Sequence, residues 1–266
     1  MNSKRFIVLF LSLFFGLFFG MSAAALPPPH KGTISAINVG ARFSSVSQSR
    51  GVVLYRDYQI DPVISLFFFD EKIAFFGSSM HYQQFIVDDR VRFRTRLVSI
   101  NDNPLFPNHE SVSKGDPDRK STYEWSNGVD LFFPGYNDDY QGEIELSLSK
   151  DLTLHGGNYV SLVGKVKLFE FTTLNTRVEP NFVGTTGWGD RAHNEYLYGP
   201  SDREAGINNV SYGIWLAFPD RADRYYPIVQ LMRYQVVGDS HRNAEYARDR
   251  NEGFLFSVIA TYPLLH

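Results

Sequence analysis

The residue that comes closest to a catalytic nucleophile is Ser126, which lies between Trp125 and Asn127 in an alternating segment. A serine hydroxyl is a weak nucleophile until a neighbouring base, most often a histidine, takes its proton. Glu124 and Trp125 stand where such a histidine would be expected. The histidines that could serve instead lie elsewhere in the chain: His81, His109, His155 and His193. We therefore predict that the chain is not an enzyme, with lipid hydrolysis through Ser126 as the alternative.

Two clusters carry side chains that could hold a metal ion. Residues 137–139, with Glu143 nearby, offer the oxygen ligands that a hard cation such as calcium prefers. They lack the fixed spacing of a calcium-binding loop, and a solvated turn explains them. His193 stands between Asp190 and Glu195 and could chelate a metal, but a polar surface loop explains these residues equally well. We expect neither a bound metal nor a cofactor.

Arg92, Arg94 and Arg96 recur at every second position of one alternating segment. In a strand such residues lie on one face, about 6.6 Å apart. Facing the interior of a barrel, three guanidinium groups would favour anions or pair with carboxylates such as Glu143 and Glu145. Of these two interpretations we favour charge neutralisation that fills a narrow interior. The residues predicted to face the interior are Arg92, Arg94, Arg96, Glu143, Glu145, Lys165 and Lys167.

The segments that carry these residues alternate apolar and polar side chains with a period of two. This period predicts strands with one face in an apolar environment, and turn-forming residues separate the segments. If both chain ends lie on the same side, the number of strands must be even. Twelve strands are predicted: 33–46, 50–57, 60–69, 72–86, 90–100, 122–133, 141–150, 157–168, 174–186, 207–219, 225–238 and 251–264.

A soluble β-sandwich also alternates, but three observations favour an all-β, transmembrane antiparallel barrel. First, the polar face of several strands is densely charged while the other face is large and apolar, as in barrels that expose their apolar face to lipid. Second, aromatic residues reach 15% and gather near predicted strand ends, as at membrane interfaces. Third, short connections alternate with three long polar ones, 101–121, 187–206 and 239–250, which we expect to be extracellular.

The first 25 residues have the layout of a signal peptide, with Lys4 and Arg5 before the apolar run 6–21 and small residues at 22–25. A retained anchor helix is the alternative. Cleavage would remove two of 26 basic and none of 29 acidic residues, so the net charge would fall from −3 to −5. This charge gives no electrostatic reason to expect nucleic acid. The lack of cysteine excludes disulfides and thiolate sites. Residues 26–266 then form one domain.

Four short motifs lie between residues 142 and 199. They are Lys150-Asp151-Leu152-Thr153, His155-Gly156-Gly157, Val178-Glu179-Pro180 and His193-Asn194-Glu195-Tyr196-Leu197-Tyr198-Gly199. In these motifs the chain resembles the MipA/OmpV family of outer-membrane proteins, and residues 55–58 with Pro62 are a looser match. The chain departs from such barrels at its end, because the aromatic residue with which they commonly finish is followed here by residues 263–266.

The resemblance implies a non-enzymatic β-barrel in the outer membrane of a Gram-negative bacterium. It also implies a scaffolding role that joins a lytic transglycosylase to a penicillin-binding protein, although relatives can act as porins or adhesins. We therefore predict a structural protein of the cell envelope that is surrounded by outer-membrane lipid. A channel for small solutes is the alternative, and a lipid hydrolase that uses Ser126 is a third interpretation.

Overall fold

The computed structural model describes the chain from Ile34 to Leu265. Within this span the residues left undescribed are 46, 51, 56–58, 70–71, 77–78, 88–89, 101–121, 135–139, 174–175, 203, 219–225 and 249–250. The predicted signal peptide, the connection 101–121 and the acidic turn 137–139 therefore lie outside the described residues. Among the described helices, none has the length and the apolar character needed to cross a membrane.

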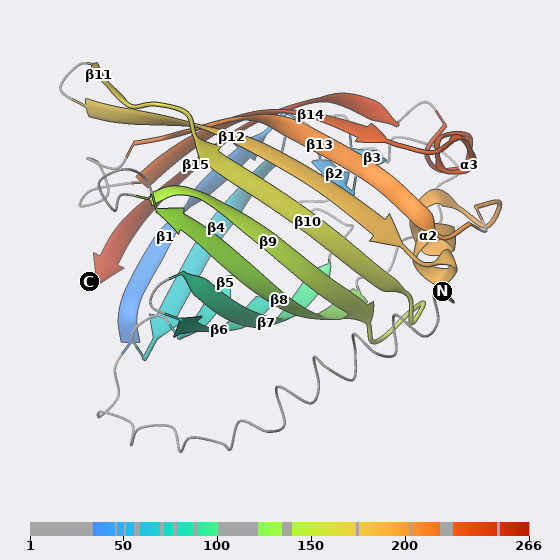
Figure 1. Ribbon diagram of the computed structural model, residues 1–266, viewed down its shortest axis with the longest axis horizontal. Coiled ribbons are helices and arrows are strands. Elements are labelled where there is room, and N and C mark those ends of the chain that lie inside the picture. The colour runs from blue at the N-terminus through green and yellow to red at the C-terminus, as the bar shows by residue number, and fades with distance from the viewer. Residues whose placement is uncertain are drawn as a thin grey trace. The chain divides into compact units, whose positions relative to one another are not determined.

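Twelve antiparallel strands close into a barrel. Figure 1 shows how the strands of the wall curve around the interior. In order around the wall they are β10 (Asn158–Lys167), β9 (Tyr140–Asp151), β8 (Thr122–Pro134), β7 (Val91–Ile100), β6 (Ser79–Val87), β5 (Ile73–Phe76), β4 (Gln59–Phe68), β1 (Ile34–Ser44), β15 (Glu252–Leu265), β14 (Tyr226–Val236), β13 (Gly206–Ala217) and β12 (Thr176–Gly189). The wall closes because β12 pairs with β10 from Gly189 opposite Tyr159 to Asn181 opposite Lys167.

The two ends of the barrel carry different elements. At one end, called the mouth here, lie α2 (Arg191–Tyr198) and α3 (Asp239–Arg242) (Figure 1). The short hairpin of β2 (Ser47–Ser49) and β3 (Val52–Tyr55) belongs to the β1–β4 connection at this end. The opposite end, called the terminal end, holds the start of β1, the end of β15 and β11 (Phe171–Thr173), whose one partner among the described strands is β12.

The predicted twelve-stranded barrel is confirmed, but two of the predicted segments are wrong. The described part of 50–57 does not form a barrel strand, because β3 pairs with β2 in a separate two-stranded sheet. Residues 72–86 contain two strands, since β5 ends at Phe76 and β6 begins at Ser79, with Phe76 opposite Ser79 in the register. The sequence has Gly77-Ser78 between them, which are turn-forming residue types. The first error adds one strand to the predicted number and the second omits one, so the predicted total of twelve is unchanged.

Burial in the barrel is the inverse of burial in a soluble protein. Along β8 the polar residues Glu124, Ser126 and Asp130 are buried, while Trp125 and Leu131, which have the opposite parity, are exposed. The same alternation runs along the neighbouring strand β9. Soluble domains bury large apolar side chains and leave most charged residues exposed. The wall therefore presents an apolar face outward and a polar face to the interior, which is the pattern of a barrel in lipid.

Candidate functional site

Two clusters of charged side chains lie on the interior of the barrel. The first, called the wall cluster, consists of Arg92, Arg94, Arg96, Asp130 and Glu145 on three adjacent strands. The second lies at the mouth, between the β2–β3 hairpin, β8, the β9–β10 connection and α2. It is called the mouth cluster and consists of Arg50, Glu124, His155 and His193.

The seven residues predicted to face the interior share one face of the sheet. In the register Arg92 lies opposite Asp130, Asp130 lies opposite Glu145, and Glu143 lies opposite Lys165. Residues on one face recur at every second position of a strand. All seven therefore lie on the same face as Asp130, which is 1% exposed.

In the wall cluster, three arginines neutralise two carboxylates. Arg92 Nε donates to Asp130 Oδ2 at 2.7 Å, and Arg94 Nη2 donates to Asp130 Oδ1 at 2.6 Å. Arg94 also contacts Glu145, and Arg96 Nη2 donates to Glu145 Oε1 at 2.8 Å. The sequence pattern points to Glu145, whereas Asp130, which binds two of the three arginines, is absent from the predicted set. A signal for it exists, because Asp130 has the same parity as Ser126 in the alternating segment 122–133.

The lysines predicted to face the interior lie outside the wall cluster. Lys167 Nζ donates to Glu170 at 2.8 Å and to Glu179 at 3.2 Å. It thereby joins the connection after β10 to β12 at the terminal end. Lys165 lies next to Glu143 in the register between β9 and β10.

Ser126 lies in the interior wall beside Arg96. Its side chain is buried, and Arg96 Nη2 lies 3.4 Å from Ser126 Oγ as a donor. A guanidinium group has no lone pair that could accept the serine proton. The contact recorded for this hydroxyl is thus with a cation and not with a general base.

Arg50 occupies the tip of the β2–β3 hairpin. Ser49 pairs with Val52, so Arg50 is the first residue of a two-residue loop, and its φ is +48°. This left-handed conformation is uncommon for residues other than glycine and is held here by tertiary contacts. The Tyr198 hydroxyl donates to the Arg50 carbonyl oxygen at 3.2 Å, which anchors the tip to α2.

The Arg50 side chain reaches interior residues of the barrel. Its Nη2 donates to Glu124 Oε2 at 2.5 Å, and its Nη1 lies 3.2 and 3.1 Å from the two ring nitrogens of His193. The guanidinium carbon also stands 3.9 Å from the centre of the Tyr159 ring, within the range of a cation–π contact. One guanidinium group therefore joins a strand carboxylate, a helix histidine and an aromatic ring across the mouth.

The β9–β10 connection is built around the carboxylate of Asp151. Its Oδ1 accepts the backbone N–H groups of residues 153–156 at 3.2, 2.8, 2.8 and 3.0 Å, and the Thr122 hydroxyl donates to Oδ2. Gly156 has a φ of +62°. At Gly157 a Cβ atom would overlap His193 N, so only glycine permits this approach to α2. The loop thereby fixes His155 beside His193, with ring centres 5.5 Å apart.

Helix α2 begins after Asp190, which is its N-cap. Asp190 Oδ1 accepts His193 N–H at 3.0 Å, and Oδ2 accepts both the backbone N–H and the side-chain N–H of Asn158. Through these hydrogen bonds, Asp190 joins the helix to β10. Glu195 lies 3.8 Å from Arg191 on the exposed side of the helix. The grouping of His193 with Asp190 and Glu195 considered from the sequence is therefore not assembled, since His193 faces Glu124 and His155 instead.

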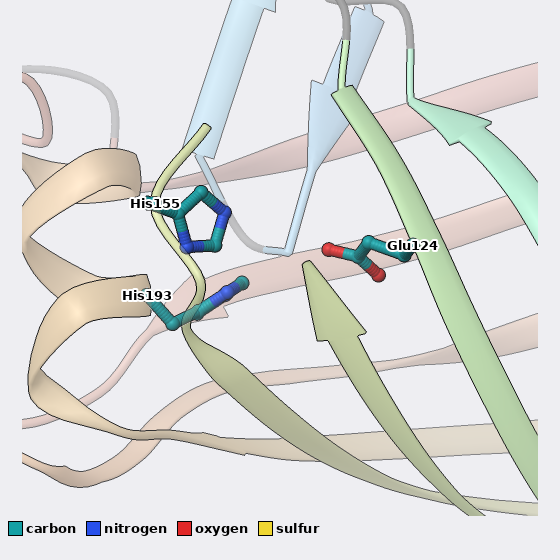
Figure 2. Close-up of side chains that lie close together, drawn as sticks. All are labelled: Glu124, His155 and His193. Atoms are coloured by element: carbon teal, nitrogen blue, oxygen red, sulfur yellow. The ribbon is translucent and has the colours of Figure 1, made fainter. Parts of the chain in front are cut away.

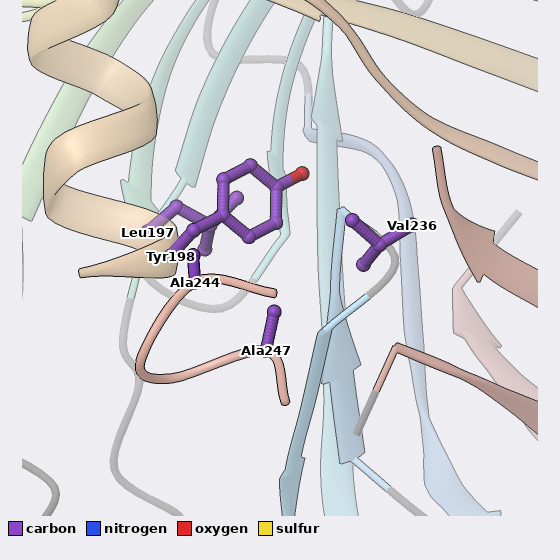
Figure 3. Packing of buried hydrophobic residues seen from close by; sticks show 5 residues of the cluster. All are labelled: Leu197, Tyr198, Val236, Ala244 and Ala247. Atoms are coloured by element: carbon purple, nitrogen blue, oxygen red, sulfur yellow. The ribbon is translucent and has the colours of Figure 1, made fainter. Parts of the chain in front are cut away.

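A small apolar cluster packs behind the helix, as Figure 3 shows. Leu197 and Tyr198 of α2 meet Val236, at the end of β14, and Ala244 and Ala247 of the β14–β15 connection. These residues are at most 3% exposed, so this is a packed core at the mouth of a barrel whose wall is otherwise inverted. It fixes the position of α2 and hence of His193.

Glu124, His155 and His193 come together from three separate elements, as Figure 2 shows. One ligand atom of each lies within 4.8 Å of the others. Burial lowers the pKa of both histidines, and Arg50 lowers the pKa of His193 further. Both imidazoles are therefore neutral at pH 7, the form that binds metals.

The four motifs that carry the family resemblance fall largely on this mouth. Asp151 and the glycines of the β9–β10 connection shape the loop, while His193 and Tyr198 of α2 contact Arg50. No model of a known protein family matches the chain, and no curated protein matches it.

Proposed function

We propose that this chain is an integral β-barrel of an outer membrane, with outer-membrane lipid around its wall. The observation that carries the proposal is the inverted burial of the wall. Leu146 and Phe254 are 46% and 64% exposed, whereas Asp130 and Glu124 are buried. In water such an apolar belt would drive aggregation, while in a bilayer it is the favoured outer face.

We further propose that the interior is closed in the resting protein and that the role of the chain is structural. Two observations support closure. The tip of the β2–β3 hairpin reaches interior residues of β8 and β10 through Arg50. Each arginine of the wall cluster is paired with a carboxylate of the same cluster, so these side chains are held in place without a solute.

The family resemblance supports a scaffolding role within this proposal. The partners that it implies are a lytic transglycosylase and a penicillin-binding protein. The mouth and the terminal end would lie on opposite sides of the membrane, with the mouth expected outside. Partners in the periplasm would then meet the terminal end.

A channel for small anions is the second candidate. It is favoured by the excess of positive charge in the wall cluster, where Arg92, Arg94 and Arg96 face Asp130 and Glu145. An unbalanced guanidinium group in a wet interior would attract anions. Lipid hydrolysis through Ser126 has less support, because the hydroxyl contacts Arg96.

Planar-bilayer conductance separates the closed barrel from the channel. The purified full chain should give no steady conductance, whereas a variant with residues 47–55 replaced by a short glycine–serine linker should conduct. Steady anion-selective conductance of the unmodified protein would make the channel the better description. Failure of the protein to float with liposomes would instead contradict the membrane proposal itself.

A further inference from the structure

The three side chains at the mouth have the composition of a transition-metal site. Glu124 supplies a carboxylate, and His155 and His193 supply imidazoles, all within 4.8 Å of one another. Two nitrogens and one oxygen suit zinc and its neighbours, whereas calcium prefers oxygen ligands alone. Three protein ligands also leave one tetrahedral position open for water or another ligand.

The side chains are shielded in the way that a specific site requires. The exposed fractions of the Glu124 and His155 side chains are 4% and 8%, and His193 is 1% exposed. The Nε2 atom of His155 is buried and has no hydrogen-bond partner among the residues that the structure describes. A buried polar atom without a partner is unfavourable, and a metal ion would satisfy this nitrogen. Asp151 Oδ2 lies 3.5 Å from the same nitrogen and adds a second carboxylate nearby.

In this structure the guanidinium group of Arg50 contacts two of the three proposed ligands, Glu124 and His193. It binds Glu124 at 2.5 Å and lies against the ring nitrogens of His193. Arg50 Nη1 therefore provides a hydrogen-bond partner for the His193 ring, whereas His155 Nε2 has none among the described residues. Arg50 thus supplies the positive charge that Glu124 needs but leaves His155 Nε2 unsatisfied.

We propose that Glu124, His155 and His193 form a site for a zinc-class divalent metal ion, and that Arg50 is a tethered cation that occupies the site until the metal displaces it. Metal binding and the present position of the Arg50 guanidinium group are mutually exclusive, because Arg50 Nη1 lies against both ring nitrogens of His193, one of which would ligate the metal. Loading the site therefore withdraws the hairpin tip from the mouth. In the metal-free structure His155 Nδ1 accepts Gly157 N–H at 3.0 Å. Coordination through Nε2 places the ring proton on Nδ1, which can then no longer accept this hydrogen bond. The β9–β10 connection therefore shifts as well.

The proposal predicts an unusual response to removal of an arginine. Arg50→Asn keeps a side chain that tolerates a positive φ and removes the competing charge. We expect it to bind Co²⁺ and Zn²⁺ at least about tenfold more tightly than the unmodified chain. Glu124→Gln and His155→Gln should each weaken binding by about tenfold or more, since even outer-shell changes at metal sites have effects of this size.

The experiment uses the full chain in detergent, with the folded state of every variant verified by heat-dependent migration in gel electrophoresis. Co²⁺ titration followed by absorbance reports tetrahedral coordination, and calorimetry with Zn²⁺ gives the affinity. Glu195→Gln, on the same helix but outside the cluster, is the matched control and should leave the affinity unchanged. The proposal is overturned if Arg50→Asn binds no more tightly than the unmodified chain, if neither gives a tetrahedral Co²⁺ spectrum, or if Glu195→Gln weakens binding. These outcomes do not depend on whether the lumen conducts.

Discussion

The wall cluster and the mouth cluster both pair buried arginine with carboxylate, but they are assembled in different ways. In the wall cluster, Arg92 and Arg96 meet carboxylates 38 and 49 residues away on strands of the same sheet region. In the mouth cluster, Arg50 meets Glu124 and His193 at separations of 74 and 143 residues, and each partner belongs to a different kind of element. Strand register alone creates the first cluster, whereas the second exists only when the loops and α2 have packed.

The difference has consequences for stability and dynamics. The wall cluster is part of the hydrogen-bonded sheet and should be lost only when the barrel unfolds as a whole. The mouth cluster rests on a short hairpin, on one loop and on one short helix, so it can open locally. Substitutions in the wall should therefore change the free energy of unfolding, and substitutions at the mouth should change local opening.

The largest effect is expected from Asp130→Asn in the wall cluster. This change leaves Arg92 without its carboxylate and Arg94 with Glu145 alone, and removing one partner of a buried ion pair typically costs about 3–5 kcal/mol. Reversible urea unfolding in lipid vesicles measures the loss. Glu252→Gln is the control, because its pair with Arg233 is exposed on both sides and should contribute less than about 1 kcal/mol. Equal losses from the two substitutions would mean that the wall cluster does not stabilise the barrel.

A somewhat smaller effect is expected from Leu146→Arg on the outer face. Leu146 lies in the middle of β9 and is 46% exposed, so the new guanidinium group would lie in hydrocarbon at a cost of about 2–4 kcal/mol. Leu152→Arg is the control, since Leu152 is 54% exposed in the connection at the mouth and should tolerate the charge at about 0–1 kcal/mol. The same unfolding measurement distinguishes them. If both positions tolerate arginine equally, the exposed apolar belt is not a lipid-facing surface.

At the mouth, Asp151→Asn should loosen the β9–β10 connection without unfolding the barrel. The amide keeps one acceptor oxygen but loses the charge that strengthens the bonds from residues 153–156, a change of about 1–2 kcal/mol in local opening. Hydrogen exchange of these four amides should accelerate, while that of β13 should stay constant. A fall in global stability as large as that of Asp130→Asn would contradict the local character of the mouth.

The smallest effect is expected from acidification. The pKa values of His155 and His193 are lowered in the folded protein, so the opened state binds protons first as the pH falls. Their contribution to stability is complete above the ordinary histidine pKa of about 6.5 and declines below it. Between pH 7.5 and 5.5, opening of α2 should increase by at most about tenfold for each histidine.

Hydrogen exchange of the α2 amides, corrected for the intrinsic pH dependence, tests this expectation. Amides in the middle of β13 serve as the internal reference, because no histidine lies in that strand. Slower corrected exchange of α2 at the lower pH would reverse the sign and would imply that protonation of a histidine strengthens the mouth.

Much of the wall follows from the sequence by itself. Alternation with a period of two determines which residues form strands and which of them share a face, because successive side chains in a strand point to opposite sides. The alternation alone therefore assigns Arg94 and Glu145 to the polar, interior face of their strands. The number of strands also agrees, although the predicted division of residues 50–57 and 72–86 is wrong. Local alternation does not reveal where a strand leaves the wall or turns within it.

The mouth is decided by tertiary structure. His193 stands out in the sequence because of its neighbours Asp190 and Glu195, yet capping of α2 uses Asp190 and the helix turns Glu195 outward. Nothing in the sequence pattern around Arg50 places it near Glu124. Their contact requires closure of the barrel and the folding of the β2–β3 hairpin, whose apolar and polar residues alternate like those of a barrel strand. Sequence periodicity reports the environment of one element, whereas a site made by four elements depends on the long-range packing that brings them together.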